Sequence, residues 1–165
     1  MHKKILAPLD GSELSEAALA HARSLAQCMG AEIMLLRVVD SPLYWADPSA
    51  DTTYMAALLD GMQAMRQAAT TYLEMIALEL RKAGLNVTTA VEEGGVAADD
   101  ILDYAHIAQA DLIVMSTHGR SGIQRWLLGS VADKVVHGAK IPVLLIRPCR
   151  EAQHVQKDTR SAGWL

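Results

Sequence analysis

The sequence contains little of what several classes of protein require. It has no phenylalanine, 4% aromatic residues and only two cysteines, Cys28 and Cys149, with no CxxC pair and no metal-binding spacing. The two thiols are therefore expected to be free, as in a reducing compartment. A net charge of −4 and the absence of a basic run predict no binding to nucleic acid and none to an anionic membrane surface.

Long hydrophobic runs are missing as well. No uncharged apolar stretch approaches the ~18 residues that a membrane helix needs. The N-terminus runs directly into a strand-like segment and has no signal-peptide pattern. The protein is therefore expected in the cytoplasm, without a membrane partner.

Aliphatic residues make up most of what is present. The chain has 165 residues, 51% of them hydrophobic, and short apolar runs alternate with helical patterns. Strands are expected at residues 4–8, 33–39, 85–91, 111–115 and 141–146. Residues 40–53 are interpreted as a loop. Helices are expected from a Ser12 cap to Gly30, over a long segment ending near Gly84, after Gly94-Gly95, and from about Ser130 to Val136.

This alternation predicts one α/β domain with a doubly wound, five-stranded parallel sheet in the order 3-2-1-4-5 and helices on both faces. The domain is expected to span residues 1–148. Residues 149–165 are polar and lack periodicity, so they are expected to form a mobile tail. The methionines of the long helix are interpreted as core residues, because methionine at helical spacing usually fills a core.

The most informative segment is a glycine-rich loop between the fourth predicted strand and a helix. Gly119 and Gly122 remove side chains where a ligand would approach the backbone. Gly129-Ser130 places free amides and a hydroxyl at a helix N-terminus, which favours a phosphate. Neither G-x-G-x-x-G after the first strand nor G-x-x-x-x-G-K-[ST] occurs, which disfavours a dinucleotide oxidoreductase and a P-loop NTPase. The alternative is a tight turn and a helix cap without a ligand.

The same loop resembles the signature of the ATP-binding universal stress proteins, which is G-x-x-G, nine residues, then G-[ST]. Gly119, the nine residues after it and Gly129-Ser130 match, while Ser116 stands at the first glycine position. The segments KILAPLDGSELSEAALAHA, LLRVVD and EEGGVAADDILDYA also match in type and order. The resemblance covers about residues 1–148. Two further departures are Ala132, where some members have a hydroxyl, and Arg37, where many have histidine.

The resemblance implies an adenine-nucleotide site for ATP, ADP or AMP, with Mg²⁺ or Mn²⁺ as a candidate metal held by the phosphates. Adenine and ribose are expected near Pro8, Leu9, Asp10, Val38 and Met115. Asp10 is expected to accept ribose hydroxyls, its alternative role being a turn or helix cap. The rest of the expected site comprises Ser116, His118, Gly119, Arg120, Gly122, Gly129, Ser130 and Val131. Arg120 is a candidate partner for a terminal phosphate, and no catalytic role is assigned to His118.

The resemblance leaves three functions open. The first is a homodimeric, ATP-dependent sensor that passes its state to an unidentified regulatory protein in a stress response. The dimer would form through the last strand, Val143 to Ile146, which the resemblance places at a sheet edge. The second is a slow, metal-dependent ATPase, and the third is a nucleotide-free interaction protein. The intact Gly119 to Gly129-Ser130 spacing argues against the third.

Overall fold

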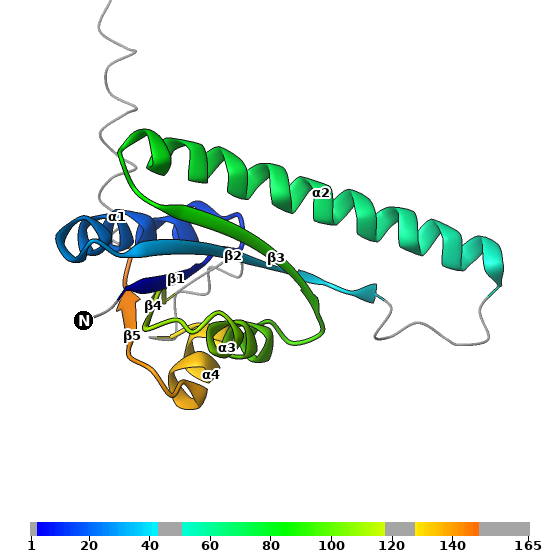
Figure 1. Cartoon of the computed structure of the whole chain (residues 1–165). Helices are drawn as coiled ribbons and strands as arrows, with labels where there is room; N and C mark the ends of the chain where they lie inside the picture. The colour runs from blue at the N-terminus through cyan, green and yellow to red at the C-terminus, as the bar shows by residue number, and fades with distance from the viewer. Residues whose placement is uncertain (1–2, 43–50, 118–127, 149–165) are drawn as a thin grey trace, which may run out of the picture.

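The structure is a computed structural model that describes residues 3–42, 51–117 and 128–148 (Figure 1). Five parallel strands form one sheet in the order β3-β2-β1-β4-β5, which confirms the predicted α/β fold and its topology. The strands are β1 (Lys4–Pro8), β2 (Glu32–Asp40), β3 (Val87–Gly94), β4 (Leu112–Ser116) and β5 (Val143–Ile146). The helices are α1 (Glu13–Met29), α2 (Thr52–Lys82), α3 (Ala97–Ile107) and α4 (Ser130–Gly138).

Two layers of helices cover the sheet, α1 and α2 on one face and α3 and α4 on the other. Alternate residues of β1 explain the division. Ile5 and Ala7 pack into the core under α1 and α2, and Leu6 packs into the core under α3 and α4. The same alternation continues in β2 and β4. The central residues of these strands are buried on both faces, which is why they appear in the sequence as near-continuous apolar runs.

The first helix begins and ends where its sequence predicts. The Ser12 hydroxyl accepts a hydrogen bond from the backbone N–H of Ser15 at 3.2 Å, which caps the N-terminus. Glu13 and Glu16 lie in the first turn, where the helix dipole favours carboxylates. Gly30 ends the helix in the left-handed conformation, with φ of +62°.

Strand β3 differs from its prediction. It begins at Val87 rather than at residue 85, and it continues through Glu92 and Glu93 to Gly94, so Gly94 is not part of a turn. Its last residues pair with Val38, Val39 and Asp40 of β2. The sequence did not predict this extension, because Glu92 and Glu93 interrupt the apolar pattern. An edge strand tolerates exposed charged residues that a buried strand would exclude. Strand β5 is likewise shorter than predicted and begins at Val143, since Pro142 has no N–H for the ladder.

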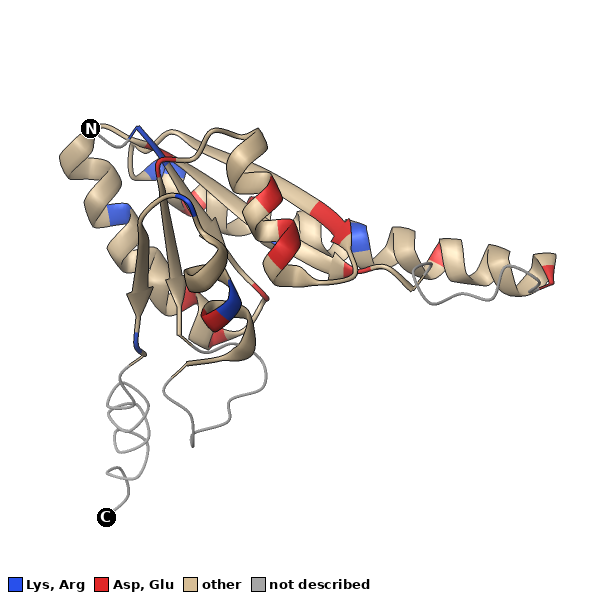
Figure 2. Ribbon diagram, turned by 90° about the horizontal axis from the view of Figure 1, so that it is seen from below, with Lys and Arg blue, Asp and Glu red and all other residues tan. Residues whose placement is uncertain are grey.

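Helix α2 is the largest departure from the sequence-based interpretation. It begins at Thr52, so the preceding loop is shorter than predicted, and Asp51 caps it. Its buried residues, Ala69, Leu73, Ala77 and Leu80, all lie in its C-terminal half. The N-terminal half extends past the sheet (Figures 1 and 2). Met65 and Met75 are 41% and 61% exposed, so these two methionines are not core residues. Periodicity identified the apolar face but not what covers it.

Within the described ranges, no helix combines the length and the hydropathy that crossing a bilayer requires. The C-terminal tail, residues 149–165, lies outside the described residues.

Candidate nucleotide site

A cavity of about 310 Å³ opens at the carboxyl ends of β1, β2 and β4. This is the switch point of the sheet, because the chain moves outward from β1 to β2 on one side and from β1 to β4 on the other. Open α/β sheets bind ligands at this point. The volume is at the lower end of the range for small-molecule sites. The lining residues are Pro8, Leu9, Asp10, Ser15, Leu36, Val38, Asp40, Ala97, Ile101, Met115, Ser116, Thr117, Gly129, Ser130, Val131 and Ala132.

Nine of the thirteen residues expected at the site line this cavity. They come from four separate parts of the chain and are Pro8, Leu9, Asp10, Val38, Met115, Ser116, Gly129, Ser130 and Val131. The other four, His118, Gly119, Arg120 and Gly122, lie outside the described residues. The fold therefore gathers every expected residue that the structure describes around one hollow.

Three helices begin at this cavity. Ser15 lies in the first turn of α1, Ala97 is the first residue of α3, and Ser130 is the first residue of α4. The residues at the N-caps of α3 and α4, Val96 and Gly129, have no side chain that accepts a capping hydrogen bond. Unbonded N–H groups at such ends attract anions, and the helix dipoles add to the attraction. The arrangement suits a ligand that carries negative charge.

The N-terminal end of α4 is held in place by strand β4. The N–H of Gly129 donates a hydrogen bond of 2.8 Å to the carbonyl of Thr117, one residue beyond β4. Gly129 has an extended conformation, with φ of −71° and ψ of 154°, which other residues also adopt. Its backbone angles therefore do not require glycine, and Gly129 is one of the residues that line the cavity.

Asp10 lies in the turn between β1 and α1. Its Oδ1 accepts hydrogen bonds from the N–H of Ser12 at 2.9 Å and from the hydroxyl of Ser12 at 2.6 Å. The hydroxyl of Ser15 accepts a bond from the N–H of Asp10 at 3.3 Å and donates to the carbonyl of Ser12 at 2.8 Å. The turn-forming role considered as the alternative is thus present, and the same residue borders the cavity.

The side chain of Arg37 packs against this turn. Gly11 has a φ of +84°, and a Cβ built there would lie 2.7 Å from Nη1 of Arg37, on β2. The Arg37 guanidinium stacks on the Tyr72 ring of α2, and the Tyr72 hydroxyl donates to Oε1 of Glu16 at 2.8 Å. Side chains from β2, α2 and α1 therefore pack together around the turn that borders the cavity.

Several lining residues were not predicted from the sequence. Leu36 and Asp40 flank Val38 at a spacing of two, so the alternation of side chains along β2 would have found both. Ile101 follows Ala97 by one helical turn, and α3 has no motif that indicates a ligand. Thr117 and Ala132 directly follow the predicted site residues Ser116 and Val131, and Ser15 lies in the helix turn after the predicted Ser12 cap. In the part of the chain that the structure describes, no three His, Cys, Asp or Glu side chains are grouped so as to hold a metal ion.

Comparison with known proteins identifies the family. The model of the universal stress protein family matches residues 1–147. The chain belongs to the universal stress protein family. The universal stress protein MJ0531 of Methanocaldococcus jannaschii is 36% identical over 150 residues, which cover 89% of this chain and 83% of that protein. The solved structure of MJ0577 from the same organism is 28% identical, with a TM-score of 0.79, over 90% of this chain and 98% of that one.

Two further structures of universal stress proteins share the fold at lower identity. One, a complex with cAMP, is 22% identical with a TM-score of 0.58 and covers 90% of this chain and 98% of its own. The other, from Archaeoglobus fulgidus in complex with dAMP, is 20% identical with a TM-score of 0.57 and covers 88% of this chain and 98% of its own. Both of those proteins hold adenine nucleotides.

Proposed function

We propose that this universal stress protein binds an adenine nucleotide in the cavity at the carboxyl ends of β1, β2 and β4. We further propose that it acts in the cytoplasm as a nucleotide-dependent sensor in a stress response. The observation that carries the proposal is the meeting of three helix N-termini at a cavity with apolar walls. A ligand with a flat apolar base and an anionic end satisfies both parts of that surface.

The lining residues divide by chemistry. Val38, Met115 and Ile101 offer apolar contacts to a base. Asp10 offers a carboxylate to the ribose hydroxyls, since ionised carboxylates only accept hydrogen bonds. The amides of Ser130 and Val131 would bind phosphate oxygens. In the same proposal, Gly119, Gly122, Arg120 and His118 complete the phosphate end of the site, as the family signature implies. The adenine nucleotides in two related structures agree with this class of ligand.

The choice among ATP, ADP and AMP depends on how many phosphates the loop accepts. We propose ATP as the ligand, because the loop that follows β4 matches the ATP-binding signature except at Ser116. A divalent ion, Mg²⁺ or Mn²⁺, would be held mainly by the phosphates. Asp10 and Asp40 are the two carboxylates that line the cavity and are available to assist.

A slow ATPase is the second candidate function. The observation that favours it is the presence of two carboxylates, Asp10 and Asp40, in the lining of the cavity. Their negative charge could help to hold a divalent cation beside the phosphates. Neither carboxylate is identified as a base for the attacking water, which is why we propose a sensor rather than an enzyme. A nucleotide-free interaction module would leave the cavity without a role.

Identification of the co-purified ligand is the direct test. The purified protein would be denatured and its supernatant analysed by mass spectrometry, and calorimetry would then measure the binding of ATP, ADP, AMP and cAMP to ligand-free protein. Asp10→Asn should weaken binding. Asp133→Asn, which removes an exposed carboxylate from the first turn of α4, should not, because Asp133 does not line the cavity. Absence of a nucleotide together with no measurable binding would reject the function.

We also propose a homodimer through β5. This strand lies at the end of the sheet order, and all four of its residues, Val143 to Ile146, are partly exposed. A second copy related by a two-fold axis would pair with its outer edge and continue the sheet. Sedimentation at micromolar concentration tests this contact, and a monomer under those conditions would contradict it.

A further inference from the structure

The cavity crosses three neighbouring strands, and a different chemistry lies at each. At β2 the lining is apolar, with Leu36 and Val38, and beside β4 it contains Ser130 at the N-terminus of α4. Asp10 follows β1, the strand between these two. A nucleotide has the same order of parts, namely an apolar base, a sugar with hydroxyls and an anionic phosphate. The strand order therefore places Asp10 at the sugar.

Asp10 is held through both its side chain and its backbone. Its Oδ1 accepts hydrogen bonds from the N–H of Ser12 at 2.9 Å and from the hydroxyl of Ser12 at 2.6 Å. Its N–H donates at 3.3 Å to the hydroxyl of Ser15, a residue that is 5% exposed. The carboxylate is therefore oriented before a ligand arrives, which lowers the entropic cost of binding to it.

The proton of the Ser12 hydroxyl has a defined direction. A serine hydroxyl has one proton to donate, and its oxygen accepts through its lone pairs. The oxygen of Ser12 accepts from the N–H of Ser15 at 3.2 Å, and its proton is donated to Asp10. This bond of 2.6 Å has the length typical of a hydroxyl that donates to an ionised carboxylate. Asp10 thus presents to the cavity a group that only accepts hydrogen bonds.

We propose that the carboxylate of Asp10, held by Ser12 as its positioning residue, selects nucleotides whose 2′ and 3′ ribose hydroxyls are both free. The inference rests on the proposed function, because it specifies which adenine nucleotides that site takes. A free hydroxyl donates to the carboxylate. A sugar without hydroxyls displaces water from the carboxylate and gives no donor in return. A 3′,5′-cyclic phosphate brings negative charge toward the carboxylate and removes the 3′ hydrogen that would be donated.

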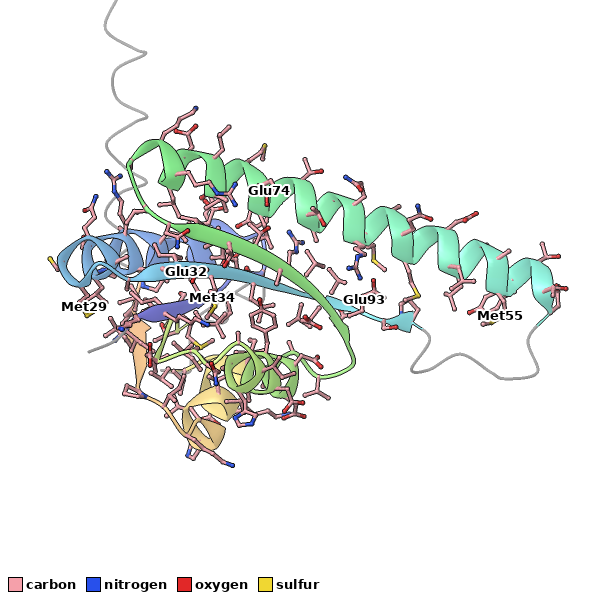
Figure 3. The ribbon with its side chains drawn as sticks, viewed as in Figure 1. Met29, Glu32, Met34, Met55, Glu74 and Glu93 are labelled. Atoms are coloured by element: carbon pink, nitrogen blue, oxygen red, sulfur yellow. The ribbon has the colours of Figure 1, made fainter. Side chains whose placement is uncertain are left out.

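Other carboxylates of the sheet are less well placed for this role. Glu32 and Glu93 are labelled in Figure 3, and neither lines the cavity. Glu32 lies at the start of β2, at the end of the strand remote from the cavity, and Glu93 forms an ion pair with Arg66 at 2.8 Å. Asp40 does line the cavity, but it ends β2, beside the apolar part of the lining. Asp10 is therefore the carboxylate placed at the sugar.

Calorimetry with matched ligands tests the selectivity. Wild-type protein should bind ATP at least about tenfold more tightly than 2′,3′-dideoxy-ATP, which has the same base and triphosphate but neither hydroxyl. AMP should likewise bind more tightly than 3′,5′-cyclic AMP. Equal affinities for ATP and 2′,3′-dideoxy-ATP would overturn this proposal and leave nucleotide binding intact. If neither ligand binds, the proposed function itself is wrong, and this inference fails with it.

Substitutions of Ser12 test its role as a positioning residue. Ser12→Ala and Ser12→Gly both remove the hydroxyl. They should reduce the preference for ATP over 2′,3′-dideoxy-ATP to about threefold or less, with the affinity for the dideoxy ligand close to that of the wild type. Ser12→Thr keeps the hydroxyl and should restore the preference. The glycine variant is included because glycine caps a helix nearly as well as serine, so α1 keeps its N-terminus.

The control for the loss of a helix cap is Asp51→Ala. Asp51 caps α2 by accepting a hydrogen bond from the N–H of Thr53, and it is not among the residues that line the cavity. This variant should lose stability and keep the full preference for ATP. A purely structural role for Ser12 would weaken the binding of both ligands by the same factor. That result, or an unchanged preference in Ser12→Ala and Ser12→Gly, would overturn the proposal.

Discussion

The guanidinium carbon of Arg37 lies 5.1 Å from the centroid of the Tyr72 ring, so a cation on β2 stacks on an aromatic side chain of α2. The Tyr72 hydroxyl adds a hydrogen bond to Glu16 of α1. Tyr72→Phe keeps the stacking and loses this bond, and should reduce the free energy of unfolding by about 1 kcal/mol. Tyr72→Leu loses both and should cost about 2 kcal/mol. Urea unfolding of the two variants would measure the difference, and equal losses would mean that the stacking contributes nothing.

The same tyrosine predicts a pH dependence. Burial, followed by the hydrogen bond and the negative charge of Glu16, raises the pKa of Tyr72 above the ordinary value of 10.0. The folded state therefore favours the protonated phenol. The resulting stabilisation is complete below pH 10 and is lost as the pH rises toward the folded-state value. Consequently, the stability advantage of the wild type over Tyr72→Phe should shrink above pH 10. A constant difference in alkaline unfolding experiments would contradict the assignment.

Gly94 and Asp100 should be energetically coupled. A Cβ built on Gly94 would overlap the Asp100 carboxylate, whose Oδ2 is buried without a hydrogen-bond partner among the described residues. Gly94→Ala should therefore destabilise the fold by about 1–3 kcal/mol, as overpacking does. In an Asp100→Ala background the clash is absent, so the added methyl should cost less than about 1 kcal/mol. A double-mutant cycle by urea unfolding measures the coupling. Equal costs in both backgrounds would mean that the two residues do not interact.

A side chain at Gly129 should obstruct the phosphate end of the cavity. Gly129→Val is expected to lower ATP affinity at least about tenfold, or about 1.4 kcal/mol, in calorimetry. Gly119→Val should lower ATP affinity by a similar factor, because the family signature implies that Gly119 also contacts the phosphates. Ala57→Val adds a β-branched residue on α2, away from the cavity, and should bind ATP like the wild type. Wild-type affinity in folded Gly129→Val and Gly119→Val proteins would contradict the assignment of the loop.

ATP turnover should be far slower than in enzymes. Binding energy that stabilises substrate and transition state equally gives little acceleration. We therefore expect turnover below about one per minute, compared with the ~10 per second typical of enzymes. A single-turnover assay with pure protein and Mg²⁺ or Mn²⁺ measures it. Rapid hydrolysis that disappears in Asp10→Ala would instead support the ATPase.

The sequence predicted the sheet because its central strands are buried on both faces. Residues 33–39 form a near-continuous apolar run interrupted only by Arg37, and residues 111–115 form a short apolar run that begins at Asp111. Such runs between helical patterns have few other interpretations. The end of β3 was harder to predict, since Glu92 and Glu93 belong to an edge strand where burial does not constrain the residue type.

The candidate site was predictable only in part. Asp10 and Ser130 belong to segments that resemble the family, whereas Ile101 reaches the cavity through the packing of α3, which no local motif encodes. The exposed half of α2 was missed for a related reason. The spacing of Met55 and Met62 predicts an apolar face but not whether the face lies on the protein's own sheet.

The cavity described above draws its lining from residues between Pro8 and Ala132. A chain emerging from the ribosome therefore has no complete cavity until α4 has been synthesised and β4 has entered the sheet beside β1. No fragment that ends before α4 contains the whole lining, so ligand capture must follow the long-range assembly of the sheet, which is the slow part of folding. A ligand that binds only the assembled form then stabilises the whole domain at once, by mass action on a single folding equilibrium.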